Sequence, residues 1–268
     1  MLHHIIYKNE NLTAPWIVFI HGAGGSSTIW FKQVNSFRKE YHVLLVDLRG
    51  HGRTVVDEKI NKKLDYTFPS IAAEVFDVLD ENNIEKAHFV GVSLGTLIIR
   101  QLAELAPERI LSMVLTGAII SLTPLSRTLI FVGNTLKKVV PFIFLYSLFA
   151  FIILPRRNHA KSRAIFIHEA KKLKKKEFIR WFGLTASLDS TLKRYAKSIH
   201  GIPVLFISGR QDHMFIEDVM KMAELEPSGT MQIIENCGHI VNIEKSEEFN
   251  CKSLEWLREL LIINSKNN

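Results

Sequence analysis

Apolar residues recur along this chain in two alternating patterns. Short unbroken apolar runs predict strands buried on both faces of a parallel sheet, and stretches with apolar residues at helical spacing predict the helices between them. The alternation implies a mostly parallel central sheet flanked by helices, with right-handed crossovers. The expected strands are residues 3–7, 16–20, 42–47, 88–91, 110–116, 202–209 and 231–235, and the expected helices are residues 27–39, 70–81, 94–105, 215–225 and 246–261.

The sharpest change of pattern lies around Ser93. A β-branched run ends at Gly91, Ser93 stands between Gly91 and Gly95, and helical spacing begins at once. This pentapeptide fits G-x-S-x-G, in which a tight turn lifts a serine oxygen clear of the sheet, near a helix N-terminus. A side chain at either glycine would collide with the neighbouring strand or helix. The alternative is an ordinary strand-to-helix turn, because glycine and serine are common turn residues.

Residues 121–200 interrupt the alternation of strands and helices. From 121 to 198 the chain carries sixteen lysines and arginines and three acids, although the whole chain has 34 and 27. The excess positive charge therefore belongs to this one segment. We expect an α/β core formed by residues 1–120 and 201–268, with residues 121–200 as a helical cap, or lid.

Composition excludes several other classes of protein. The only two cysteines, Cys237 and Cys251, imply no disulfide framework and no zinc spacing, so we expect a reducing compartment and neither metal nor cofactor. The first residues show no basic stretch followed by a long apolar core, so no signal peptide is expected. These features predict a cytoplasmic protein.

A serine nucleophile needs a base, and the base needs a group that fixes its tautomer. Downstream of this turn, which is called a nucleophile elbow, Asp212 follows one expected strand and His239 follows the next. Because ligands bind at the carboxyl ends of strands in open α/β sheets, Ser93, Asp212 and His239 are expected to converge. Asp212 could instead cap the following helix, with Glu235 or Glu217 as third member, and His239 could be a core histidine.

An oxyanion hole would complete such a site. One donor should be the backbone N–H of Leu94, which follows the nucleophile, and the other should come from the loop after the strand at 16–20. In that loop Ala23 is the candidate, since its small neighbours let the backbone approach a substrate carbonyl.

Taken together, these motifs resemble the α/β-hydrolase superfamily, in the branch whose cap is inserted between the sixth and seventh strands. The resemblance implies a serine hydrolase of esterase or lipase type, in which His21, Asp47, Arg49 and His51 brace loops. Serine in place of aspartate makes haloalkane or epoxide chemistry unexpected. The family usually opens with a β-hairpin, for which this chain has little room. The matching stretches are His21-Gly22, residues 47–52, residues 91–95, residues 209–212 and Gly238-His239.

Residues 139–154 of the cap are almost uninterruptedly apolar. The run is shorter than the 18 or so residues of a membrane span, and one span here would put Ser93 and His239 on opposite sides of the bilayer. It could instead line an acyl-binding tunnel or dip into a membrane interface. The basic residues at 156–180 suit an anionic membrane surface or head group, or are simply a solvated face. Nucleic acid is not expected, because aromatic residues do not alternate with these charges.

The function expected from these features is hydrolysis of a small-molecule carboxylic ester with a lipophilic acyl group, through an acyl-enzyme on Ser93. Activity should rise with pH between about 6 and 8, because a histidine base must lose its proton. The same triad could act on lactones, on carbon–carbon bonds or in perhydrolysis. The fold also serves ligand receptors without turnover.

Overall fold

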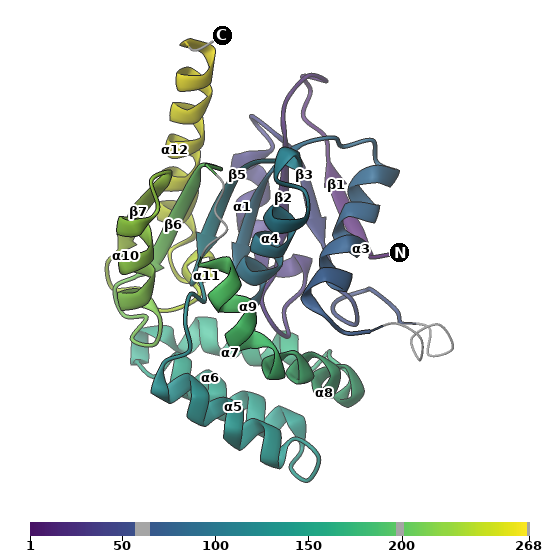
Figure 1. The fold of residues 1–268 in the computed structure, drawn as a ribbon, viewed down its shortest axis with the longest axis vertical. Coiled ribbons are helices and arrows are strands. Elements are labelled where there is room, and N and C mark those ends of the chain that lie inside the picture. The colour runs from purple at the N-terminus through teal and green to yellow at the C-terminus, as the bar shows by residue number, and fades with distance from the viewer. Residues whose placement is uncertain (57–64, 197–200, 267–268) are drawn as a thin grey trace.

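In the computed structural model, which describes residues 1–56, 65–196 and 201–266, the strands form one seven-stranded sheet (Figure 1). Its order is β1-β3-β2-β4-β5-β6-β7, and neighbouring strands are parallel except β1, which pairs antiparallel with β3. The expected mostly parallel α/β sheet is therefore confirmed. The strands are β1 (His4–Tyr7), β2 (Trp16–Ile20), β3 (His42–Val46), β4 (Ala87–Val92), β5 (Ile110–Thr116), β6 (Val204–Gly209) and β7 (Gly229–Ile234).

Alternate side chains of the central strands enter two separate cores. On β2, Ile17 and Phe19 face the core shared with α1 and α12, whereas Val18 and Ile20 face the core shared with α3 and α4. Both faces are buried, which is why these strands appear as unbroken apolar runs in the sequence. The helices outside the cap are α1 (Phe31–Phe37), α3 (Phe68–Glu81), α4 (Leu94–Leu105), α10 (Ile216–Leu225), α11 (Val241–Glu244) and α12 (Ser246–Lys266).

Two details near the N-terminus differ from the expected elements. The helix expected at 27–39 is a 3₁₀ turn, Ser27–Trp30, followed by the shorter α1. The short N-terminal segment supplies a single edge strand, β1, where the family has a hairpin. The cap therefore follows the fifth strand of this chain, whereas the resemblance implies a position after the sixth, because one strand and not two precedes β2.

The described residues between β5 and β6 form five α-helices, which we call the cap. Figure 1 shows them gathered at one end of the sheet. The expected boundary at residue 200 lies outside the described residues. Among those described, no helix is long and apolar enough to cross a membrane. The cap helices are α5 (Pro124–Leu136), α6 (Phe142–Ile153), α7 (Ala160–Ala170), α8 (Lys175–Gly183) and α9 (Leu188–Tyr195).

The apolar run at 139–154 forms α6 and its flanks. The helix begins after Pro141, its N-cap residue, and ends before Leu154, because Pro155 disfavours helical geometry in the residue that precedes it. Twelve residues span about 18 Å at 1.5 Å per residue, well short of a bilayer core.

Strand register places the carboxyl ends of the strands together. Ile20 is aligned with Gly91, Val92 with Thr116, and Thr116 with Ile207. The loops that follow β2, β4, β6 and β7 consequently emerge at the same edge of the sheet, beneath the cap.

Candidate active site

Ser93 occupies a strained turn between β4 and α4. Its φ and ψ angles are 53° and −118°, and it is one of only three non-glycine residues with positive φ in the described part of the chain. Such a conformation costs of the order of 1–3 kcal/mol and persists only where the surroundings enforce it. This is the backbone geometry expected of a nucleophile elbow.

The two glycines of the elbow are required by close contacts. A β-carbon on Gly91 would lie 2.5 Å from Cδ1 of Ile99, and one on Gly95 would lie 2.3 Å from the carbonyl oxygen of Ile20. Gly91 thus lets α4 fold back onto β4, and Gly95 lets α4 pass the end of β2. Both contacts are the collisions that the sequence pattern predicts.

His239 and Asp212 meet at the same edge of the sheet. Oδ2 of Asp212 lies 2.8 Å from Nδ1 of His239, and both residues are buried. The ring of Phe215 packs on the imidazole, with centroids 5.1 Å apart. Gly117 lies so close that a β-carbon there would be 3.0 Å from Cε1 of the imidazole. The imidazole is thus held on one side by a carboxylate and on two others by packing.

Two of the alternatives, a capping role for Asp212 and Glu235 as the third member, do not fit the contacts in this structure. The N-cap residue of α10 is Phe215, and no side chain caps that helix. Glu235 is exposed and pairs with Arg210 at 3.0 Å. The carboxylate of Asp212 therefore points to His239 rather than to a helix end.

The loop after β2 passes directly beside Ser93. A β-carbon on Gly22 would lie 3.3 Å from that of Ser93 and 3.2 Å from the carbonyl oxygen of Val92, so glycine at residue 22 eases the close approach of this loop. Ala23, Ser93 and His239 all line one small cavity of about 20 Å³. The candidate oxyanion donors, the N–H groups of Ala23 and Leu94, thus belong to segments that meet at the nucleophile.

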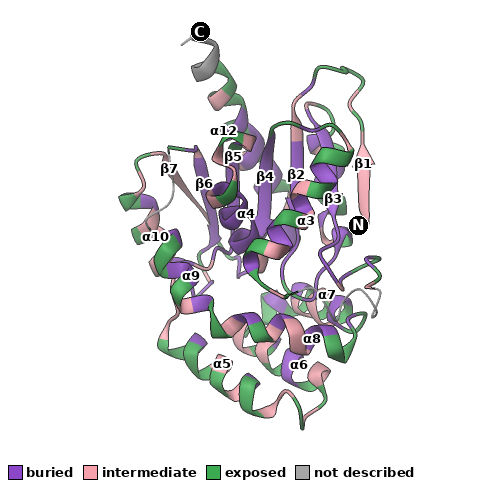
Figure 2. Cartoon of the chain, turned by 45° about the vertical axis from the view of Figure 1, so that its right-hand side comes forward, coloured by how far each residue is buried: buried purple, intermediate pink, exposed green. Residues whose placement is uncertain are grey.

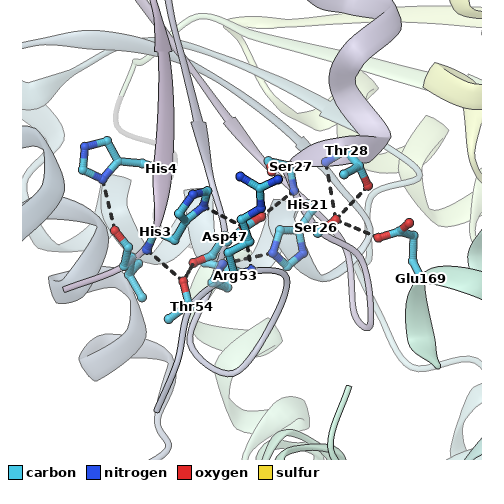
Figure 3. A network of polar contacts seen from close by, with 12 residues as sticks. His3, His4, His21, Ser26, Ser27, Thr28, Asp47, Arg53, Thr54 and Glu169 are labelled. Atoms are coloured by element: carbon cyan, nitrogen blue, oxygen red, sulfur yellow. Dashed lines mark hydrogen bonds and ion pairs between the residues drawn. The ribbon is translucent and has the colours of Figure 1, made fainter. Parts of the chain in front are cut away.

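A buried polar network holds this loop in place (Figure 3). Asp47 accepts hydrogen bonds from the backbone N–H of Ser27 at 2.6 Å and of Arg53 at 2.9 Å. Burial alone would raise the pKa of Asp47, but these two N–H groups hold it below its usual value. His21 donates from Nδ1 to the carbonyl of Gly22 and accepts at Nε2 from the N–H of Leu48.

His51 makes a second connection between the same two loops. Its Nε2 accepts from the N–H of Gly24 at 3.0 Å, while Nδ1 lies 3.1 Å from the carbonyl of Arg49. Burial lowers the pKa of His51 to about 3, so the ring is neutral and can accept this hydrogen bond. The arrangement matches the bracing roles that the resemblance implies for His21, Asp47 and His51.

The cap residues that hydrogen-bond core loops include three that contact the loops following β2 and β3, and no sequence motif identified them. The hydroxyl of Tyr146 donates to the carbonyl of Ala23, Ser26 donates to Glu169 at 2.7 Å, and Nε1 of Trp181 donates to the carbonyl of Arg49 at 2.9 Å. Each contact joins residues more than a hundred positions apart, so no local signal could have found it. The cap therefore contributes directly to the shape of the loop beside Ser93.

An apolar cavity of about 220 Å³ opens from Ser93 beneath the cap. None of the described residues that line it carries an ionised side chain, since His51 is neutral. A second apolar space of about 210 Å³ shares lining residues with it, among them Phe149 and Phe182, and continues toward α5 and Phe215. The lining residues with large apolar side chains include Phe68, Leu97, Ile119, Phe149, Ile153, Phe178, Trp181 and Phe182.

Two other expectations concern cysteine and metals. Cys237 is fully buried beside His239, and burial raises the pKa of its thiol, so it is a protonated packing residue. In residues 1–56, 65–196 and 201–266, no three histidine, cysteine or acidic side chains are grouped to hold a metal ion.

Comparison with known proteins agrees with this fold. The model of the alpha/beta hydrolase fold matches residues 15–144, and the chain belongs to the α/β-hydrolase superfamily. A proposed carbamate hydrolase, RutD, of Pseudomonas savastanoi pv. phaseolicola is 27% identical over 268 residues, covering 96% of this chain and 98% of the relative.

Two solved structures share the architecture. An esterase from Thermogutta terrifontis superposes with a TM-score of 0.79 at 18% identity, covering 97% of this chain and 93% of the esterase. An enol-lactonase from Burkholderia xenovorans LB400 gives 0.74 at 22% identity, covering 96% of each chain. At these identities the likeness concerns the fold alone.

Proposed function

We propose that this protein hydrolyses carboxylic esters with a lipophilic acyl group, using Ser93, His239 and Asp212 as a catalytic triad. The observation that carries the proposal is the 2.8 Å contact between Asp212 and His239 at the same sheet edge as the strained Ser93, beside an apolar cavity. The names of relatives in sequence support hydrolysis at an acyl carbon, since they include a proposed carbamate hydrolase, a proposed esterase or lipase and, over 31% of this chain, an enol-lactonase.

In this mechanism His239 removes the proton of the Ser93 hydroxyl as the oxygen attacks the ester carbonyl. Asp212 keeps the proton of His239 on Nδ1, so that Nε2 is free to act as base. The N–H groups of Ala23 and Leu94 stabilise the negative oxygen of the tetrahedral intermediate. His239 then gives its proton to the leaving alcohol, and water hydrolyses the acyl-enzyme by the same steps.

The cavity supports the choice of a lipophilic acyl group. An acyl chain placed there loses contact with water along an almost wholly apolar wall, at about 0.8 kcal/mol per buried methylene. A charged acyl chain would find no partner among the described residues that line this cavity.

Turnover of p-nitrophenyl esters from acetate to palmitate tests the proposal. We expect the wild type to show an optimum at an intermediate or long chain, Ser93→Ala to be inactive, and the control Ser190→Ala, at an exposed site on α9, to match the wild type. Equal rates for wild type and Ser93→Ala would refute the proposal. Lactones of matched length, assayed in parallel, distinguish ester cleavage from lactone opening, and cap-dependent ligand binding without turnover would favour a receptor.

A further inference from the structure

Helix α6 has two apolar faces, one of which lines the cavity while the other is exposed. Tyr146, Phe149 and Ile153 line the cavity that leads to Ser93. On the opposite side, Phe144, Leu148 and Phe151 are 63%, 40% and 55% exposed. At 100° per residue these two triplets point about 170° apart. We call the second triplet the outer stripe of α6.

No residue in the described part of the chain buries the outer stripe. Figure 2 shows α5 and α6 at the end of the molecule remote from the sheet, with exposed residues along them. Exposed Phe131 on α5 and Val139, just before α6, add further apolar surface to this segment. Contiguous exposed aromatic and aliphatic residues on a soluble domain typically mark a binding surface.

The charged residues nearest the outer stripe in the sequence are all of one sign. Between residues 121 and 168 the sequence has no aspartate or glutamate. Lys138 is exposed before α6, and Arg156 and Arg157 are exposed after it. The guanidinium of Arg163 lies 4.2 Å from the ring centroid of Phe151. Cations thus stand at both ends of an apolar stripe, the arrangement of a helix that lies flat in a membrane interface.

We propose that the outer stripe of α6 binds the surface of an anionic phospholipid bilayer. Phe144, Leu148 and Phe151 would enter the boundary between head groups and acyl chains, while the flanking cations contact lipid phosphates. A second copy of this chain fits less well, because a two-fold pairing of the stripe brings like charges at the helix ends together. The proposal concerns binding and holds whether or not the chain hydrolyses esters.

The position of α6 links this surface to the cavity. One side of the helix would face lipid while the other side lines the space beside Ser93. A lipophilic substrate dissolved in the bilayer would then be separated from Ser93 by the thickness of one helix. Membrane binding would raise the local concentration of such a substrate without a change in the active site.

Co-sedimentation of the full chain with vesicles tests the proposal. We expect binding to phosphatidylcholine vesicles that contain about one third phosphatidylglycerol, and weak binding to phosphatidylcholine alone. Phe144→Ser with Phe151→Ser should lower the partition coefficient about tenfold or more. Lys138→Gln with Arg156→Gln should lower it about 25-fold, about fivefold per charge. The control Phe31→Ser, at an exposed site on α1, should bind as the wild type does.

Circular dichroism and thermal unfolding of each variant establish that lost binding is not lost folding. The proposal is overturned if the wild type binds neither vesicle, or if Phe31→Ser reduces binding as much as the α6 variants do. It is also overturned if the wild type forms dimers that Phe144→Ser dissociates and shows no vesicle binding. Esterase activity measured on soluble substrate should not change in the α6 surface variants, which separates this test from that of the proposed function.

Discussion

The hydroxyl of Tyr146 on α6 donates a hydrogen bond to the carbonyl oxygen of Ala23, in the loop beside Ser93. Tyr146 is buried, and burial raises the pKa of its hydroxyl well above the usual value, so the group remains a donor at any physiological pH. The same peptide segment carries the N–H proposed to bind the oxyanion. A cap side chain therefore holds the loop on which the proposed mechanism depends.

Removal of this hydroxyl should impair the chemical step. In Tyr146→Phe the Ala23 segment loses its hydrogen bond from the cap, and we expect kcat to fall about tenfold with KM little changed, because a misplaced donor weakens transition-state binding most. Steady-state kinetics on a mid-length ester measures both constants. Tyr195→Phe, a buried tyrosine of α9 outside the site, is the control, and an unchanged kcat in Tyr146→Phe would contradict the positioning role.

Replacement of the carboxylate partner of His239 should be far more severe. Asp212→Asn removes the charge that fixes the imidazole tautomer, and kcat should fall about 10⁴-fold while the fold is retained. The matched change Glu235→Gln, at an exposed carboxylate that pairs with Arg210, should leave kcat unchanged. If Glu235→Gln were the damaging variant, the assignment of the third member would be wrong.

The elbow glycines should tolerate no side chain. In Gly95→Ala the new methyl group would lie 2.3 Å from a backbone oxygen of β2, and we expect a loss of about 3 kcal/mol or more in the free energy of unfolding. Gly183→Ala provides the control, because nothing lies within 4 Å of a β-carbon there and the residue is helical. It should be neutral or stabilising by up to about 1 kcal/mol. Urea titration compares the two variants.

Acid should destabilise the protein through its buried histidines. Burial lowers the pKa of His51 to about 3 and that of His88 to about 4, from 6.5 in the unfolded chain. Below pH 6.5 the unfolded state therefore binds protons that the folded state does not, and stability falls as the pH is lowered toward these values. At pH 5 each histidine should cost about 2 kcal/mol relative to pH 7. Urea unfolding at both pH values measures the loss, which His88→Asn should reduce.

The second apolar space should set the longest acyl chain that the protein accepts. Leu129 of α5 lines this space, and Leu129→Trp would fill much of it. We expect about tenfold lower kcat/KM for palmitate esters and no change for acetate esters, because only long chains reach that far. Leu125→Trp, at an exposed position on the same helix, serves as the control. A uniform loss across all chain lengths would indicate damage to the site rather than a shortened pocket.

The local pattern in the sequence was sufficient to predict the strands of the sheet and the turn at Ser93. Unbroken apolar runs predicted the central strands because both faces of β2 and β4 are buried, and such burial leaves a signal in consecutive residues. The glycines around Ser93 were predicted from the turn they must form, which is a property of a few neighbouring residues. Asp212 and His239 could be singled out because each follows a recognisable strand, and their contact follows from the parallel register.

The cap was decided only in the tertiary structure. The sequence distinguished the segment between β5 and β6 by its charge and its apolar run. It did not show which side of α6 would face the cavity, because almost every position of that helix is apolar and the pattern has no polar face. The hydrogen bonds from the cap to the core loops, made by Tyr146, Glu169 and Trp181, join residues more than a hundred positions apart in the sequence. Strand and turn geometry is encoded locally, whereas contacts between the cap and the loop that carries Ala23 depend on how two packed surfaces meet, and only the folded chain fixes that.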